Sequence, residues 1–146
     1  MKKYIKQLLL LLLLILLTFC ATKENLKATF PQEIVSMSFE KWTGGRRETG
    51  SGTKVRIEFK KPLQKNIYLQ KIYFQNQETE IVQENETKYS ASFYSNALYR
   101  EQHSSDAASK NFNLKDNEAV IEYKNQSKTY FYKCSNIKEI PMIMYE

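Results

Sequence analysis

Two adjacent arginines, Arg46 and Arg47, are the side chains whose type and setting best suit the binding of an anionic ligand. They lie in the stretch Gly44–Gly52, which holds all 4 glycines of the chain. Guanidinium groups bind carboxylates, phosphates and anionic sugars through paired hydrogen bonds. Trp42, at the edge of this stretch, could stack on a sugar or on an arginine. The sequence therefore offers Trp42, Arg46 and Arg47 as ligand or partner contacts, and the alternative is a solvated hairpin whose arginines only keep it soluble.

The other groups with catalytic or metal-binding potential do not form a constellation that chemistry requires. His103 is the only histidine, and Ser104–Asp106 follow it directly, whereas the members of a catalytic triad converge from separate parts of a chain. One histidine and one thiol cannot make a transition-metal site, and the carboxylates of Glu78–Glu86 suit a solvated strand face and its end. The glycines also lack the pattern of a phosphate-binding loop. We predict a surface histidine, no metal, no cofactor, no catalytic residue and no enzymatic activity.

The N-terminus has the layout of a bacterial export signal. Three lysines precede the apolar run Leu8–Leu17, and Thr18–Ala21, of which Thr18, Cys20 and Ala21 are small, follow it. A helix that spans a bilayer needs about 20 apolar residues, and this run is about half as long. We therefore expect residues 1–19 to be a signal peptide, with an uncleaved membrane anchor as the alternative.

Cys20 is the predicted site of lipid attachment. Leu17–Cys20 resembles the lipobox of bacterial lipoproteins, in which the cysteine becomes the acylated first residue of the mature chain. Phe19 occupies a position where Gly, Ala or Ser is usual, so ordinary cleavage after Cys20, with release of a soluble exported protein, stays open. Two or more acyl chains would hold the protein stably on a membrane.

Removal of the leader changes both the charge and the cysteine content. It takes away three of the 22 basic residues and leaves 19 against 16 acidic ones, a net charge of +3. This slight excess does not indicate nucleic-acid binding. Cys134 is then the one cysteine left in the mature domain, so no internal disulfide can form. We expect a buried thiol there, and the alternative is a reactive or metal-ligating one.

From Gln32 onward the apolar residues recur every second position, which is the strand period. Val55, Ile57 and Phe59 alternate with charged residues and predict a strand with one buried and one solvated face. The fold expected is an all-β, antiparallel seven-stranded sandwich of immunoglobulin-like architecture over residues 32–146, with residues 20–31 as a tether. Its strands are expected around Val35–Phe39, Val55–Phe59, 66–75, 78–84, 88–95, 118–124 and 127–134.

Three details of this sandwich are specific enough to be checked. The apolar pattern changes phase within residues 66–75, which indicates a strand buried on both sides or a β-bulge. A turn at Asn125–Gln126 would place Ile121 opposite Tyr130 and Ala119 opposite Tyr132. The long connection of residues 96–115 offers Leu98, Tyr99, Phe112 and Leu114 as anchors, around one possible helical turn at Ala107–Ser109.

The chain also resembles a group of small, uncharacterised lipoproteins of flavobacteria and related Bacteroidota. The resemblance covers about residues 34–144 and rests on five segments: Phe39–Trp42, Gly44–Gly52, Lys71–Asn76, Glu118–Tyr123 and Asn136–Met142. It implies an exported, membrane-tethered β-domain and carries no activity or binding residue to this chain. Since Glu24 is the one acidic residue close after Cys20, an outer-membrane lipoprotein that faces the periplasm is at least as well supported as one on the cell surface.

The sequence thus predicts a lipid-anchored protein of the cell envelope with a non-catalytic binding or structural β-domain. Its expected partners are the membrane, through lipidated Cys20, and an envelope protein or glycan. One alternative is a soluble periplasmic inhibitor or chaperone-like protein, which requires ordinary cleavage after Cys20. Another is a small glycan-acting enzyme, which requires two carboxylates about 5–9 Å apart in a cleft.

Overall fold

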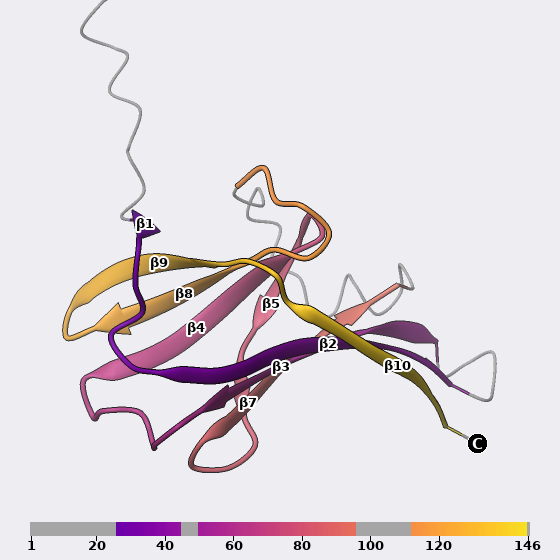
Figure 1. The fold of residues 1–146 in the computed structure, drawn as a ribbon, viewed down its shortest axis with the longest axis horizontal. Helices are drawn as coiled ribbons and strands as arrows, with labels where there is room; N and C mark the ends of the chain where they lie inside the picture. Colours follow the sequence, from indigo (N-terminus) through magenta and orange to yellow (C-terminus); the bar gives the residue numbers. More distant parts are fainter. Residues whose placement is uncertain (1–25, 45–49, 96–111, 146) are drawn as a thin grey trace, which may run out of the picture.

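The protein is a two-layered β-sandwich, as the sequence predicts (Figure 1). The computed structural model describes residues 26–44, 50–95 and 112–145. Within these residues no helix is long and apolar enough to cross a membrane. The strands are β1 (Leu26–Lys27), β2 (Ile34–Gly44), β3 (Ser51–Phe59), β4 (Ile67–Phe74), β5 (Gln77–Glu80), β6 (Val82–Gln83), β7 (Lys88–Tyr94), β8 (Ala119–Asn125), β9 (Lys128–Cys134) and β10 (Lys138–Tyr145).

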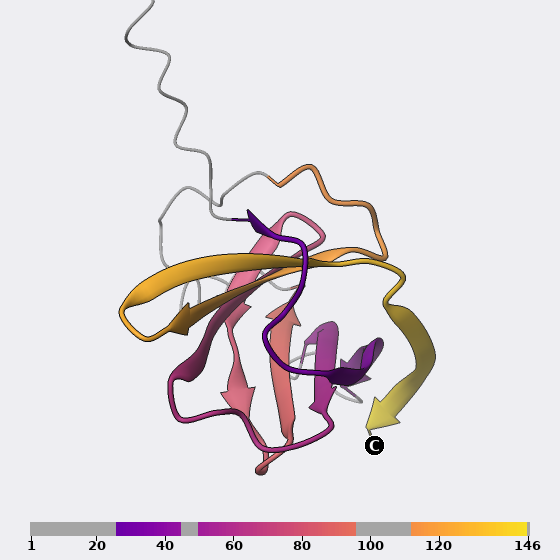
Figure 2. The same ribbon diagram turned by 60° about the vertical axis from the view of Figure 1, so that its left-hand side comes forward.

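Each layer is a mixed five-stranded sheet. The first sheet has the order β1-β9-β8-β4-β5 and the second sheet has the order β10-β2-β3-β7-β6. Most neighbours are antiparallel, but β1 runs parallel to β9 and β10 runs parallel to β2. The expectation of a purely antiparallel sandwich is therefore wrong at the two sheet edges that the first and last described strands, β1 and β10, occupy. Turning the molecule by 60° shows the first sheet above the second (Figure 2).

The described residues form ten strands where the sequence predicts seven. The predicted strand 78–84 is divided into β5 and β6, because the chain passes there from the first sheet, where β5 pairs with β4, to the second, where β6 pairs with β7. The other two additions are β1, which has only two residues, and β10. In β10 the residues from Ile140 to Tyr145 are apolar without alternation, and the register against β2 shifts between Ile140 and Ile143, around Pro141. A proline inside a strand and a broken alternation both argue against a strand in the sequence.

Strand β4 satisfies both explanations that its sequence allows. Its register against β8 shifts between Leu69 and Lys71, which marks a bulge. Beyond the bulge it is buried on both sides: Ile72 and Phe74 point into the sandwich, and Tyr73 points outward. Phe112 and Leu114 cover the outer side by packing against Tyr73, Val120 and Phe131. Their predicted role as anchors is confirmed, whereas Leu98, Tyr99 and Ala107–Ser109 lie outside the described residues.

The hairpin of β8 and β9 differs from the predicted register by two residues. Ala119 pairs with Cys134 and Ile121 pairs with Tyr132, because Gln126, not Asn125, begins the two-residue turn. Gln126 adopts a φ of 56°, a left-handed conformation that the sequence pattern does not reveal. A shift by two keeps each side chain on its face. Cys134 is accordingly buried in the core, as predicted.

The core between the sheets is built from alternate residues of facing strands. Val55, Ile57 and Phe59 of β3 are almost fully buried and confirm the predicted two-faced strand. Phe30, which precedes β2, packs on Phe59 and Tyr123 with ring-centroid distances of 5.4 and 4.7 Å. Part of the segment 20–31 that we expected to be a tether thus packs against the domain, and the described fold begins at Leu26.

Candidate binding site

The outer face of the second sheet carries the polar and aromatic side chains that could meet a ligand. Strands β2, β3 and β7 lie side by side, and their register aligns these side chains in cross-strand rows. The face is solvated because the alternate residues of β3 fill the core. Three successive rows are Trp42–Gly52–Tyr94, Glu40–Lys54–Ser92 and Ser38–Arg56–Ser90.

Trp42 lies across Gly52 and packs edge-on against Tyr94. The ring centroids of Trp42 and Tyr94 are 5.7 Å apart, with an interplanar angle of 84°. A Cβ atom at Gly52 would lie 2.9 Å from the indole ring and 2.1 Å from the carbonyl oxygen of Phe93. Gly52 therefore provides space for the indole, while Gly50, with a φ of 70°, provides the backbone conformation that favours glycine. The half-buried indole has part of its surface left for a ligand.

The connection between β2 and β3 and the much longer one between β7 and β8 leave from one end of the second sheet. The N–H of Gly44 bonds to the carbonyl of Gly50 at 2.9 Å, and the N–H of Ser95 bonds to the carbonyl of Ser51 at 2.9 Å. We call this end, at Gly44, Gly50, Ser51 and Ser95, the loop end. Arg46 and Arg47 belong to the connection between Gly44 and Gly50, and they lie outside the described residues, as do Cys20 and His103. Of the predicted contact residues, the structure describes Trp42, next to the loop end.

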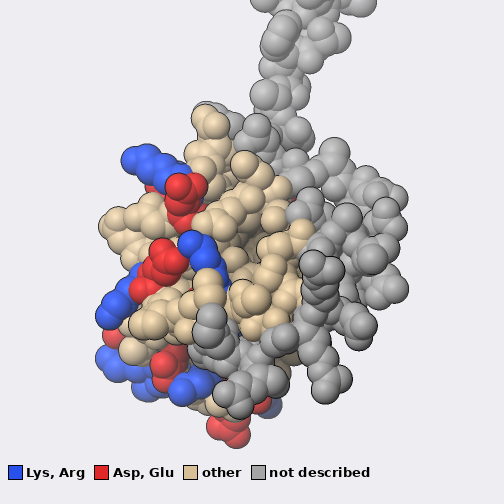
Figure 3. Space-filling view, turned by 90° about the vertical axis from the view of Figure 1, so that its right-hand side faces the viewer, with Lys and Arg blue, Asp and Glu red and all other residues tan. Residues whose placement is uncertain are grey.

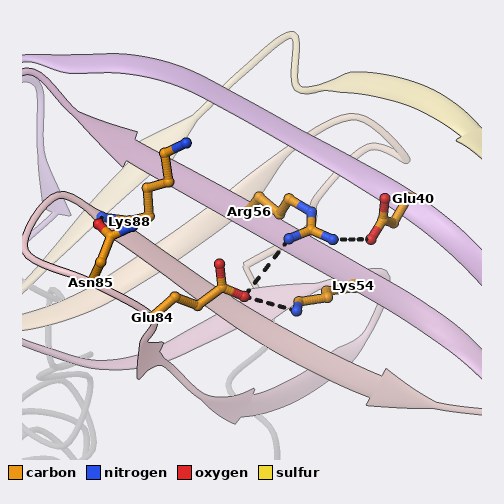
Figure 4. A network of polar contacts seen from close by, with 6 residues as sticks. All are labelled: Glu40, Lys54, Arg56, Glu84, Asn85 and Lys88. Atoms are coloured by element: carbon orange, nitrogen blue, oxygen red, sulfur yellow. Dashed lines mark hydrogen bonds and ion pairs between the residues drawn. The ribbon is translucent and has the colours of Figure 1, made fainter.

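A network of four charged residues, Glu40, Lys54, Arg56 and Glu84, lies on this face (Figure 4), and the Glu40–Lys54 pair is the row next to Trp42 and Gly52. Arg56 is its centre: one guanidinium nitrogen lies 2.5 Å from a carboxylate oxygen of Glu40, and the other lies 3.7 Å from Glu84. The ammonium group of Lys54 lies 2.8 Å from the same oxygen of Glu84. Two cations and two anions leave the network without net charge, so it does not attract an ionic ligand over a distance.

The members of this network differ sharply in exposure. The side chain of Glu40 is 2% exposed, whereas that of Arg56 is 38% exposed. Hydrogen bonds from Lys54 and Ser90 lower the pKa of Glu84 below its ordinary value. Asn85, next to Glu84, accepts hydrogen bonds from the backbone N–H groups of Thr87 and Lys88 and so holds the turn before β7. The charged groups of the network thus pair with one another, and these ion pairs connect β2, β3 and the segment before β7 on the face that carries Trp42.

The sequence does not reveal this network, because Val35, Met37 and Phe39 alternate with Ser36, Ser38 and Glu40, a pattern that predicts a buried Val35 and a solvated Glu40. A bulge between Ile34 and Ser36 changes the start of β2, and Val35 is exposed instead. The pairing of Glu40 with Lys54 follows from a hairpin in which Trp42 pairs with Gly52. That register was the available signal, because it places opposite charges across from each other.

A cavity lies at the opposite end of the sandwich from the loop end. This cavity of about 340 Å³ is lined by Gln32, Glu33, Lys60, Lys61, Pro62 and Gln64. The amide nitrogen of Gln32 donates to the carbonyls of Lys61 and Pro62, and its oxygen accepts from the N–H of Gln64. Gln32 thus clamps the loop between β3 and β4, and this contact explains the polar groups of the cavity without a ligand.

Charged side chains of opposite sign alternate over the face seen in Figure 3 and form no large patch of one sign there. Across residues 26–44, 50–95 and 112–145, no group of three or more His, Cys, Asp or Glu residues could hold a metal ion.

Comparison of the chain with protein-family models, with curated proteins and with solved structures finds no match. Trp42 and the loop end are the candidate binding site, because a half-buried indole lies there beside the origins of two connections.

Proposed function

We propose that the protein is exported, is anchored to a membrane through lipidated Cys20, and binds an envelope protein or glycan through its loop end without catalysis. The observation that carries the binding role is the hydrogen bonding of Gly44 to Gly50 and of Ser95 to Ser51. These hydrogen bonds bring the origins of the β2–β3 and β7–β8 connections together beside Trp42. Loops that a rigid sandwich gathers at one end are a common place for binding residues.

The export and anchoring part of the proposal rests on the sequence. A basic start, the apolar run Leu8–Leu17 and the lipobox-like Leu17–Cys20 support it, as does the resemblance to small lipoproteins of flavobacteria. Mass spectrometry of the mature N-terminus tests it. A diacyl or triacyl adduct on Cys20 supports the anchor, whereas an unmodified chain that starts at Ala21 replaces it with a soluble periplasmic protein.

The binding part is tested by removal of the two arginines. We expect Arg46→Ala with Arg47→Ala to weaken retention of the protein by immobilised envelope proteins or glycans, with a nearly unchanged melting temperature, because a guanidinium contact to a ligand does not stabilise the fold. Lys61→Ala with Lys65→Ala removes the same charge from exposed positions at the other end of the sandwich and serves as the matched control. Equal loss of retention in both double variants would reduce the effect to net charge, and a large fall in melting temperature would make the arginines structural.

We also retain the immunoglobulin-like architecture as a proposal. Two packed sheets and mainly antiparallel neighbours support it, and the parallel edge strands β1 and β10 are the features that any comparison of topology has to accommodate.

A further inference from the structure

We propose that the part of the outer side of the first sheet that Phe112 and Leu114 leave exposed, with Leu26, Tyr68 and Lys124, rests on the lipid headgroups of the membrane that anchors the protein. This inference depends on the proposed lipidation of Cys20. It goes beyond that proposal because it assigns a membrane-facing side, which the presence of an anchor alone does not determine.

The length of chain between the anchor and the fold carries the argument. Five residues, 21–25, separate Cys20 from Leu26, where the described fold begins. Even fully extended, this segment spans only about 20 Å. A domain of this size is about 35 Å across, from the usual scaling of the radius of gyration with chain length. The far side of the domain therefore cannot turn toward the membrane unless the short segment runs around the molecule.

The position of β1 then selects the side. It is the edge strand of the first sheet, with Leu26 paired to Phe131 and Lys27 paired to Tyr132. Figures 1 and 2 both show β1 beside β9, away from β2, β3 and β7. Phe131 belongs to the outer face of the first sheet, where it packs with Tyr73 and Val120. Leu26 lies next to it and is 51% exposed, a position suited to contact with the headgroup region.

The outer face of the first sheet carries two side chains with the chemistry of a membrane interface. Lys124 of β8 is exposed, and within the described part of the chain no carboxylate pairs with it. Tyr68, which pairs with Lys124, is 60% exposed. Lys27 lies on the other side of the sheet, over the ring of Tyr130, 4.8 Å from its centroid, because Tyr130 packs against the core. Lysines attract anionic headgroups, and tyrosines prefer the boundary between headgroups and acyl chains.

The carboxylates of the first sheet are farther from β1 or already engaged. Glu78 and Glu80 belong to β5, the edge strand opposite β1, and Glu78 pairs with Lys71. Glu122 accepts a hydrogen bond of 2.6 Å from the hydroxyl of Tyr73. Lys133 pairs with Glu118. Among the described residues of this outer face, Lys124 therefore keeps its positive charge without a carboxylate partner, which matches an anionic surface.

Two matched cysteine variants test the orientation. Tyr68→Cys places a thiol on the outer face of the first sheet, and Lys88→Cys places one on the outer face of the second sheet, at a side chain that is 51% exposed. Each new thiol is labelled with a fluorophore, since the buried Cys134 does not compete. The acylated protein is then incorporated into vesicles of phosphatidylethanolamine and phosphatidylglycerol that contain lipids with a nitroxide quencher on the headgroup. We expect several-fold stronger quenching at Tyr68→Cys.

The outcomes separate this inference from the proposed anchor. Equal quenching of the two variants, or stronger quenching at Lys88→Cys, overturns the orientation while vesicle flotation still supports the anchor. A chain without acyl groups on Cys20, which does not float with vesicles, overturns both. Insertion of a flexible Gly–Ser segment of about 20 residues between Thr22 and Lys23 adds a reach of about 25 Å. It should abolish the difference between the variants, and a difference that survives would show that the short segment does not set the orientation.

Discussion

Glu40 belongs to a row of side chains that faces away from the sandwich core, yet it is among the most buried residues described. Removing a carboxylate from water is expensive unless a partner compensates for it. Arg56 is that partner, and Lys54 and Glu84 extend the contact to the solvent. The guanidinium group of Arg56 therefore compensates for the buried charge of Glu40 and stabilises the outer face of the second sheet.

Substitution of Arg56 should reveal the buried charge. We expect Arg56→Met to lower the free energy of unfolding by about 2–3 kcal/mol, because Glu40 would be left without its cation. The matched control is Lys88→Met, which removes a cation from an exposed pair with Glu58 and should cost less than about 1 kcal/mol. Urea unfolding measures both. Similar losses in the two variants would contradict the assigned importance of burial.

Cys134 offers a second test at this scale. Burial raises the pKa of its thiol to about 12, so we expect the native protein to react very slowly with a thiol reagent near neutral pH. Cys134→Ser should lower the free energy of unfolding by about 1–3 kcal/mol, since a hydroxyl replaces the thiol in an apolar setting. If the native thiol is labelled fast and the Cys134→Ser variant unfolds at an unchanged urea midpoint, this side chain lies at the surface.

Among the elements, β10 is the one whose loss should matter most. It pairs in parallel with β2 and covers one edge of the second sheet. We expect a chain that ends after Asn136 to expose the edge of β2 and to associate through it, because unpaired strand edges template further pairing. Size-exclusion chromatography with light scattering measures this association. A chain that ends after Met144 is the control, and a monomeric truncated chain of native stability would show that β10 is dispensable.

The sequence predicts well the elements whose core face alternates regularly. Strands β7, β8 and β9 appear within one residue of their expected bounds, and β3 ends where expected but begins four residues earlier, at Ser51. It fails where the alternation is interrupted: at the bulge of β2, at Pro141 in β10 and in the two residues of β1. The candidate site follows the same rule. Trp42 and the glycine-rich stretch are evident from composition, whereas the buried Glu40 becomes visible only when the register of β2 and β3 is known.

At the scale of the whole molecule, titration of a few groups predicts how stability depends on pH. Lys54 and Ser90 lower the pKa of Glu84, and the backbone N–H of Lys115 and the ammonium group of Lys133 lower the pKa of Glu118. Such carboxylates contribute fully above the ordinary value of about 4.5, and the contribution is lost as the pH falls below it. The raised pKa of Cys134 acts in the opposite range, so its contribution is lost as the pH rises above about 9.

We therefore expect the free energy of unfolding to have a plateau between about pH 4.5 and 9, with losses on both sides. Urea unfolding across this range measures it. Glu84→Gln should reduce the slope on the acid side, and Cys134→Ser should reduce it on the alkaline side. A maximum of stability below pH 4, or slopes unaffected by either substitution, would contradict the assignment of these groups.

The parallel pairing of β10 with β2 also orders events during synthesis. The residues of β2 leave the ribosome early, but β10, which covers their edge, is made after all the other described strands. A nascent chain therefore cannot complete the second sheet before β10 has emerged, and pairing segments about 100 residues apart makes this a slow, non-local step.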